Sequence, residues 1–196
     1  MTSDGATLTR TLDASTTFRP AKLAHVVLRT AHFDEAIDWY QTVLGAFTVF
    51  RSDALAFLTY DEEHHRIALA AVPPVERRPE DRARPGLEHI GFTYASLGEL
   101  LGTFRRLRAA GIEPTWAVNH GPTTSIYYED PDGNEIELQV DNFADLQGLL
   151  GWASSGAFAI NPIGTLFDPE DLARRLEAGA PEADLLHPLG PDQMQP

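Results

Sequence analysis

The strongest constraint on the fold is an internal repeat that occupies the middle of the chain. In both copies the hydrophobic pattern predicts a strand, a helix closed by glycine, and then three further strands. The first copy covers residues 22–73 and the second covers residues 86–143. HVVLRT, which begins at His25, and HIGFTY, which begins at His89, occupy the same place in the two copies. Because one such unit cannot bury its apolar face alone, we expect the two units to pair around a cleft.

The predicted elements follow from alternation, helical spacing and turn residues. In the first copy they are strands Lys22–Thr30, Ala46–Ser52, Ala54–Tyr60 and His65–Val72, and helix Phe33–Leu44. In the second copy they are strands Leu87–Tyr94, Glu113–His120, Thr123–Glu129 and Asn134–Val140, and helix Leu97–Ala110. The sequence therefore predicts an α+β fold, in which two βαβββ repeats form one curved mixed sheet with the helices outside.

Three segments differ from the repeats. Residues 1–20 are polar and are predicted to be a flexible arm, and residues 73–85, rich in proline and charge, are predicted to be a linker within the domain 21–143. Residues 144–196 form an acidic extension with a short helix that starts at Asp168 and includes Pro169 in its first turn. This extension cannot form a core alone, so we expect it to lie over the domain or a partner.

Composition excludes several classes of protein. The chain has no cysteine, which rules out disulfides, thiolate metal sites and iron–sulfur clusters. A net charge of −14 without a basic stripe argues against nucleic acid as a partner. No apolar run approaches the roughly 20 residues that span a bilayer, and the first residues lack a secretory pattern. We therefore expect a cytoplasmic protein with a small-molecule ligand.

Two histidines and one glutamate are candidate metal ligands. A single histidine in an apolar strand is more often a core residue than a ligand, but equivalent positions in a repeat would make the His25 and His89 rings converge. Glu137 lies between two apolar residues of a strand expected to be central, which is unusual unless the carboxylate is paired or metal-bound. The alternatives are two unrelated buried histidines and a glutamate at a strand edge in water.

The motifs around these residues resemble a known pattern. His25 in AHVVL, His89 in EHIGF and Glu137 in DPDGNEIEL resemble the metal-binding pattern of the vicinal oxygen chelate superfamily, across roughly residues 22–140. That superfamily includes extradiol dioxygenases, glyoxalase I, epimerases and metal-free antibiotic-binding proteins, so membership does not itself specify a reaction. The resemblance implies that the curved sheet surrounds a metal cleft with these three residues as ligands.

Comparison of the two repeats favours one branch of the superfamily. IEL at 136–138 aligns with IAL at 67–69, so Ala68 is the equivalent of Glu137. A glyoxalase-like site generally takes a ligand from this position in both halves, whereas here the first half offers a methyl group. Two imidazoles and one carboxylate suit Fe(II), with Mn(II) as the other candidate, and leave positions for a chelating substrate and O₂.

Three further residues match the extradiol pattern. By resemblance, His65 is the acid–base residue, and Tyr127 and His120 hydrogen-bond the substrate oxygens. Tyr127 lies ten residues before Glu137, and Tyr128 could replace it if the register shifts. The alternatives are a turn histidine at His65, ordinary strand tyrosines, and a turn cap at His120.

The sequence thus predicts an Fe(II)-dependent extradiol dioxygenase, which inserts O₂ into a catechol-type diol and yields a ring-opened keto-acid. We expect a homodimer, because a lone curved sheet would leave exposed edges. Three alternatives stay open: a glyoxalase-like lyase or isomerase, a metal-free binding protein, and a scaffold. Ala68 argues against the four-ligand form of the first, and the complete ligand set argues against the second.

Overall fold

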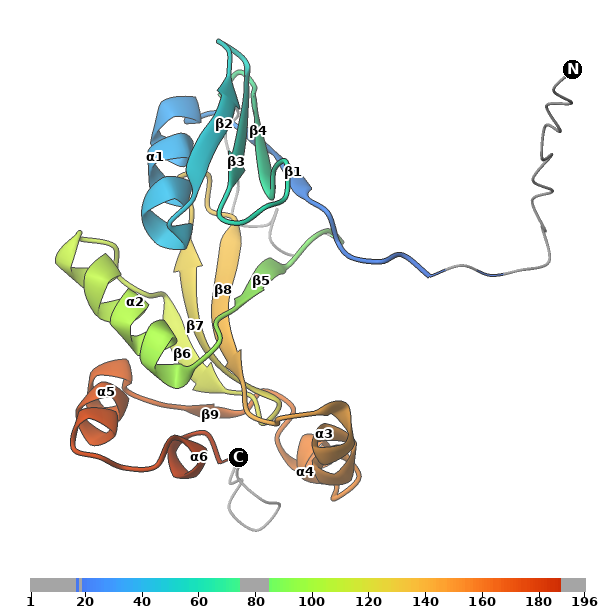
Figure 1. The fold of residues 1–196 in the computed structure, drawn as a ribbon, viewed down its shortest axis with the longest axis vertical. Coiled ribbons are helices and arrows are strands. Elements are labelled where there is room, and N and C mark those ends of the chain that lie inside the picture. Colours follow the sequence, from blue (N-terminus) through green and yellow to red (C-terminus); the bar gives the residue numbers. More distant parts are fainter. Residues whose placement is uncertain (1–16, 18, 75–84, 188–196) are drawn as a thin grey trace, which may run out of the picture.

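Two βαβββ units form the body of the protein, whose computed structural model describes residues 17, 19–74 and 85–187 (Figure 1). The first unit contains β1 (Val26–Thr30), α1 (Phe33–Leu44), β2 (Phe47–Arg51), β3 (Leu55–Thr59) and β4 (Ile67–Ala71). The second contains β5 (His89–Thr93), α2 (Leu97–Ala109), β6 (Trp116–Asn119), β7 (Thr123–Glu129) and β8 (Glu135–Asp141). Most of the predicted N-terminal arm and linker lie outside the described residues.

The two helices form where the apolar spacing predicted them. In α1, the residues that face the core are Ala36, Ile37, Tyr40 and Val43, and the helix ends at Gly45 with φ of 64°. In α2, the Ser96 side chain accepts a hydrogen bond from the Glu99 amide at 3.2 Å and so caps the first turn. Both helices therefore turn one apolar face to the core.

The α+β class with outer helices is confirmed, but the strands form two sheets instead of one. The first sheet has the order β1-β4-β3-β2 and the second has the order β5-β8-β7-β6-β9. In each, the first strand of the repeat runs parallel to the last and lies at the sheet edge. β1 and β5 are not paired with each other, so β1 leaves an open edge on the first sheet and β5 leaves one on the second.

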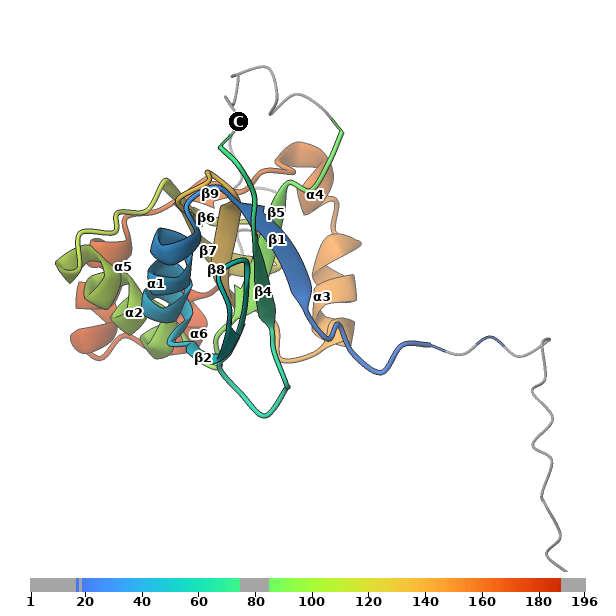
Figure 2. The ribbon, with the colours of Figure 1, turned by 90° about the horizontal axis from the view of Figure 1, so that it is seen from above.

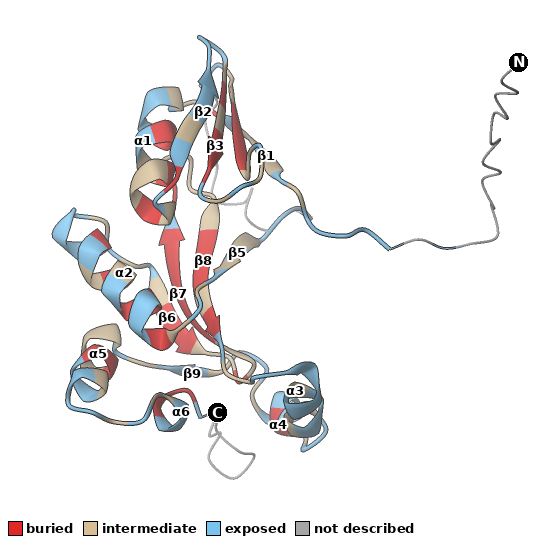
Figure 3. Ribbon diagram, viewed as in Figure 1, coloured by how far each residue is buried: buried red, intermediate tan, exposed pale blue. Residues whose placement is uncertain are grey.

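One core nevertheless joins the two units. Buried residues from α1, α2 and both sheets belong to one hydrophobic cluster (Figure 3). The turn between β7 and β8 reaches into the first unit, where the Tyr40 hydroxyl donates to Asp130 Oδ2 at 3.0 Å. Asp132 Oδ1 accepts a hydrogen bond from the Ala31 amide at 3.0 Å. These contacts fix the turn of the second unit against the first.

The C-terminal extension wraps the second unit. It contains α3 (Leu146–Ala153), α4 (Ala157–Ile160), β9 (Thr165–Leu166), α5 (Pro169–Glu177) and α6 (Glu182–Leu185). Figure 2 shows α5 on the same side of the sheets as α1 and α2, and α3 and α4 on the other side. The predicted helix is α5, and Asp168 caps it by accepting the Glu170 amide at 2.8 Å. No helix within the described residues is long and apolar enough to cross a membrane.

Candidate functional site

The second sheet brings His89 and Glu137 together. His89 begins β5, Glu137 lies on the adjacent β8, and His89 Nε2 is 3.2 Å from Glu137 Oε2. The Glu137 side chain is buried. Gly91 lies opposite Glu137 in the strand register, and a Cβ there would lie 3.1 Å from Glu137 Oε2. The missing side chain at Gly91 therefore makes room for the carboxylate.

Tyr127 holds the other oxygen of this carboxylate. Tyr127 on β7 is in register with Glu137 on β8, and its hydroxyl donates to Glu137 Oε1 at 2.9 Å. The Trp116 ring stacks on the Tyr127 ring with the centroids 4.5 Å apart. Burial raises the pKa of Tyr127 above its usual value, and the charge of Glu137 raises it further. At neutral pH the phenol therefore keeps its proton and acts as a hydrogen-bond donor.

His120 extends the chain of polar contacts by one residue. It follows the last residue of β6, and its Nε2 lies 2.9 Å from the Tyr127 hydroxyl. Its other ring nitrogen, Nδ1, lies 2.5 Å from the carbonyl oxygen of Ile163 in the C-terminal extension. Of the six predicted site residues, the second sheet thus gathers His89, Glu137, Tyr127 and His120.

The other two predicted residues lie together on the first sheet. The His25 and His65 ring centroids are 4.2 Å apart, and His65 also stacks on Phe57 at 4.4 Å. Burial lowers the pKa of His65, and the neighbouring His25 and His64 lower it further. The His64 ring lies close to both of them, with centroids 5.9 Å from His25 and 4.4 Å from His65.

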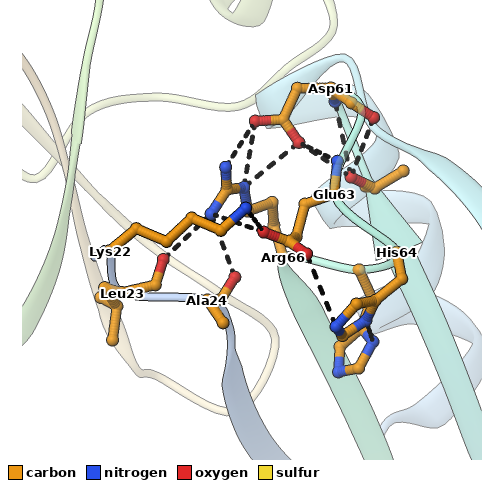
Figure 4. Close-up of polar contacts among 9 residues, drawn as sticks. Lys22, Leu23, Ala24, Asp61, Glu63, His64 and Arg66 are labelled. Atoms are coloured by element: carbon orange, nitrogen blue, oxygen red, sulfur yellow. Dashed lines mark hydrogen bonds and ion pairs between the residues drawn. The ribbon is translucent and has the colours of Figure 1, made fainter. Parts of the chain in front are cut away.

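Arg66 holds the segment that leads into His25 (Figure 4). Its guanidinium donates to the carbonyl oxygens of Leu23 at 3.0 Å and Ala24 at 3.1 Å, and pairs with Asp61 Oδ2 at 2.8 Å. Hydrogen bonding to Arg66 in turn lowers the pKa of Asp61. Arg66 thus helps to position His25 by binding the two carbonyls just before it.

The predicted ligand triad does not come together within one chain. Among the described residues, the cluster whose ligand atoms lie within 4.8 Å of one another consists of His25, His64 and His65. His89 and Glu137 belong to the second sheet, which is not paired with the first. One chain therefore presents two partial sites, one on each sheet.

The strand registers agree with the alignment of the two repeats. Val27 on β1 lies opposite Ala68 on β4, just as Gly91 on β5 lies opposite Glu137 on β8. The first sheet thus pairs a large residue with a methyl group where the second pairs glycine with a carboxylate. Sequence reasoning missed the role of Gly91, although its alignment with Val27 was a usable signal. It also missed the contact of the Ile163 carbonyl with His120, because every residue has a carbonyl oxygen and the sequence does not show which one makes a contact.

The separation of His89 and Glu137 fits a shared metal ion. Two ligand atoms that each lie about 2.1 Å from a metal, at a right angle to each other, are about 3.0 Å apart. The observed 3.2 Å between His89 Nε2 and Glu137 Oε2 is close to that value. An imidazole and a carboxylate are also a donor set that Fe(II) and Mn(II) accept. The pair can therefore supply two adjacent coordination positions.

Comparison with known proteins identifies the family. Residues 22–138 match the model of the Glyoxalase/Bleomycin resistance protein/Dioxygenase superfamily. The chain belongs to this superfamily. Two relatives that are similar to this chain come from Rhodococcus globerulus, and both are named biphenyl-2,3-diol 1,2-dioxygenase. Enzyme 2 is 43% identical over 160 residues, covering 82% of this chain and 84% of the relative. Enzyme 3 is 46% identical over 165 residues, covering 84% and 86%.

Solved structures of the superfamily share the fold. A glyoxylase/bleomycin resistance protein/dioxygenase domain from Frankia aligns with a TM-score of 0.55 at 22% identity, covering 65% of this chain and 96% of that one. A fosfomycin resistance protein from Listeria monocytogenes aligns with a TM-score of 0.51 at 19% identity, covering 67% and 99%. Each alignment leaves about a third of this chain uncovered.

Proposed function

We propose that this superfamily member is an Fe(II)-dependent extradiol dioxygenase, which cleaves the ring of a catechol-type diol with O₂ and releases a ring-opened keto-acid. The observation that carries the proposal is the contact chain from His89 through Glu137 and Tyr127 to His120. It places a pair of metal-type ligands beside two hydrogen-bonding groups. The two Rhodococcus relatives that are named for this reaction support the same conclusion.

The proposed ligands are His25, His89 and Glu137, with Fe(II) as the metal and Mn(II) as the alternative. Bound there, the metal would supply the oxygen chemistry and hold both oxygens of the diol. Ala68, opposite Val27, offers no fourth protein ligand, so coordination positions would stay open for substrate and O₂. This distinguishes the proposal from a glyoxalase-like site with four protein ligands.

The remaining groups have roles set by their surroundings. Tyr127 keeps its phenol proton, so it can donate a hydrogen bond to a substrate oxygen. His120, whose Nε2 lies 2.9 Å from the Tyr127 hydroxyl, is proposed as the second residue that hydrogen-bonds the substrate. His65 is proposed as the acid–base residue because its ring lies beside His25. Tyr127 contacts the proposed ligand Glu137, His65 contacts the proposed ligand His25, and His120 contacts Tyr127.

We further propose a homodimer in which His25 of one copy faces His89 and Glu137 of a second copy. The supporting observation is that each chain carries the two halves of the ligand set on separate sheets. Val27, which shares the sheet face of His25, is 58% exposed, and β1 and β5 both have an open edge. A second copy would cover these surfaces and bring the halves together.

The deciding experiment is anaerobic reconstitution with Fe(II), followed by exposure to air with a panel of catechols that includes biphenyl-2,3-diol. We expect oxygen uptake and a yellow ring-opened product. A protein that retains iron but turns over no catechol contradicts the proposal. Turnover of a glutathione hemithioacetal in its place would assign the chain to the lyase branch.

Glu137 provides a separate test of the metal site. We expect Glu137→Ala to lower iron affinity by more than about 100-fold, since a direct ligand should matter more than the groups around it. Glu135→Ala is the matched control, two residues away on the same strand, and should retain iron. Iron content measured after desalting decides the matter, and equal content in both variants would remove Glu137 from the site.

A further inference from the structure

We propose that the C-terminal extension is part of the active site, because the Ile163 carbonyl fixes the orientation and the tautomer of His120. The matched superfamily region ends at residue 138, so this segment lies beyond it. Its effect on turnover rests on the dioxygenase function proposed above, whereas its effect on the His120 ring does not.

The extension runs directly beside the strand that ends before His120. β9 pairs antiparallel with β6, with Leu166 opposite Val118 and Thr165 opposite Asn119. Because the strands are antiparallel, Ile163 and Gly164, which precede β9, lie next to His120, which follows β6. There the Ile163 carbonyl oxygen lies 2.5 Å from His120 Nδ1.

Asn161 shapes the turn that presents this carbonyl. Its Oδ1 accepts hydrogen bonds from the amides of Ile163 at 3.2 Å and Gly164 at 3.0 Å. Its Nδ2 donates to the Gly164 carbonyl at 2.7 Å. One side chain thus holds both peptide units around Ile163, which leaves the carbonyl little freedom to turn away from His120.

Gly164 allows the extension to approach so closely. It has φ of +106°, and a Cβ there would lie 2.2 Å from the Asn119 carbonyl oxygen and 2.7 Å from His120 Cα. Both distances are far below van der Waals contact, and both atoms belong to the backbone. Any side chain at this position would push the extension away from the strand.

A second part of the extension contacts the other side of His120. Trp152, on α3, lies so close to Gly121 that a Cβ at Gly121 would be 2.1 Å from the indole. The Trp152 ring is itself packed edge-on against Phe158 of α4 at 4.7 Å. Two separate segments of the extension therefore meet the backbone on either side of His120.

The contact with the Ile163 carbonyl determines which ring nitrogen of His120 carries the proton. A carbonyl oxygen only accepts hydrogen bonds, so His120 must carry a proton on Nδ1. In the neutral ring Nε2 is then bare and faces the Tyr127 hydroxyl, 2.9 Å away. Tyr127 has a single proton, which it can donate either to Glu137 or to His120. The Ile163 carbonyl therefore makes His120 Nε2 the alternative acceptor for the Tyr127 proton.

The test is a measurement of the His120 tautomer in the full-length, metal-free chain. Long-range ¹H–¹⁵N spectra of ¹⁵N-histidine protein distinguish a proton on Nδ1 from one on Nε2, and His120→Gln assigns the signal. We expect the Nδ1–H form in the wild type and a mixture of forms in Gly164→Ala. Asn161→Ala, which removes the turn contacts without adding an atom, should give the same mixture. Gly179→Ala is the matched control, because its φ is +88° but its Cβ would meet nothing within 4 Å.

Catechol turnover provides the second measurement. We expect kcat to fall roughly 10- to 100-fold in Gly164→Ala and Asn161→Ala, in step with the change of tautomer, and to stay unchanged in Gly179→Ala. An Nε2–H tautomer in the wild type overturns the proposal. So does an unchanged tautomer in both folded variants, or a changed tautomer with normal turnover. If the wild type cleaves no catechol, the dioxygenase function fails, while the spectra still decide whether the extension fixes His120.

Discussion

Tyr127 and Tyr128 are adjacent residues with opposite surroundings. The Tyr127 hydroxyl contacts Glu137 and His120, whereas the Tyr128 hydroxyl is buried without a hydrogen-bond partner among the described groups. The sequence spacing selected Tyr127, and the register of β7 with β8 agrees with that choice. The two residues therefore form a natural pair of test and control.

Tyr127→Phe should lower kcat on catechol by roughly 10- to 100-fold and leave iron content unchanged, because it removes a donor to the substrate and no ligand. Tyr128→Phe should leave kcat unchanged and keep or raise the free energy of unfolding by up to about 1 kcal/mol, since it removes an unpaired buried hydroxyl. Steady-state kinetics and urea unfolding of both variants check this. Equal losses of activity would mean that Tyr127 acts only through packing.

The proximity of site candidates could be predicted from the sequence where they lie on adjacent strands. His89, Glu137 and Tyr127 lie on neighbouring strands of one sheet, so their positions in the repeat brought them together. His25 was different, because equivalence in a repeat says which strand carries a residue but not which sheet faces it. Among the described residues, the His25 ring clusters with His64 and His65 and not with His89 and Glu137.

Strands begin later than predicted where a side chain binds the backbone carbonyls or where a proline lacks the amide proton. The strand predicted for Lys22–Thr30 begins only at Val26, because Arg66 binds the carbonyls of Leu23 and Ala24. The strand predicted for Glu113–His120 begins at Trp116, two residues after Pro114, which has no amide proton for a sheet. α3, α4, α6 and the two-residue β9 were not predicted, since such short elements show little periodicity.

Arg66 gives a prediction at the level of this strand entrance. Arg66→Lys should lower iron affinity roughly tenfold, because one ammonium group cannot bind two carbonyls and a carboxylate in the geometry of a guanidinium. Arg51→Lys is the control, since Arg51 pairs with the exposed Asp34 on the outer surface. Iron titration of the two variants distinguishes them. Wild-type affinity in Arg66→Lys would show that the segment before His25 needs no such support.

At the scale of the whole molecule, the turn between β7 and β8 carries a charged link between the two units. Burial alone would raise the pKa of Asp132, but hydrogen bonds with Thr30, Ala31 and His32 outweigh it, and the pKa lies below its usual value. A carboxyl group with a lowered pKa in the folded state stabilises the fold at pH values above its unfolded pKa. That contribution is lost as the pH falls through the folded pKa.

Asp132→Asn should therefore lower the free energy of unfolding by about 1 kcal/mol at pH 7, and the difference from wild type should shrink at acidic pH. Urea unfolding at pH 7 and at pH 3 measures both quantities. Asp38→Asn, on the exposed face of α1, should have no effect at either pH. A difference that stays constant with pH would show that the charge of Asp132 does not link the units.

The proposed dimer predicts that two inactive variants restore each other. His25→Ala and Glu137→Ala should each be inactive, but in a mixed dimer both defects fall into one site and leave the other intact. Random mixing then gives about a quarter of wild-type activity, since about half of the dimers are mixed and each has one intact site. Glu137→Ala mixed with Tyr127→Phe, both on the second sheet, should show no more than the residual activity of Tyr127→Phe alone. Absence of recovery in the first mixture, after unfolding and refolding together, contradicts a shared site.

The opposed pairs Val27–Ala68 and Gly91–Glu137 also bear on how such a chain can evolve. Installing a carboxylate at position 68 would require a glutamate beside a valine, where the second repeat has only a glycine. To copy the arrangement of the second repeat, the first repeat would need Ala68→Glu together with Val27→Gly. The difference between three and four protein ligands thus involves two neighbouring strands, and not one position alone.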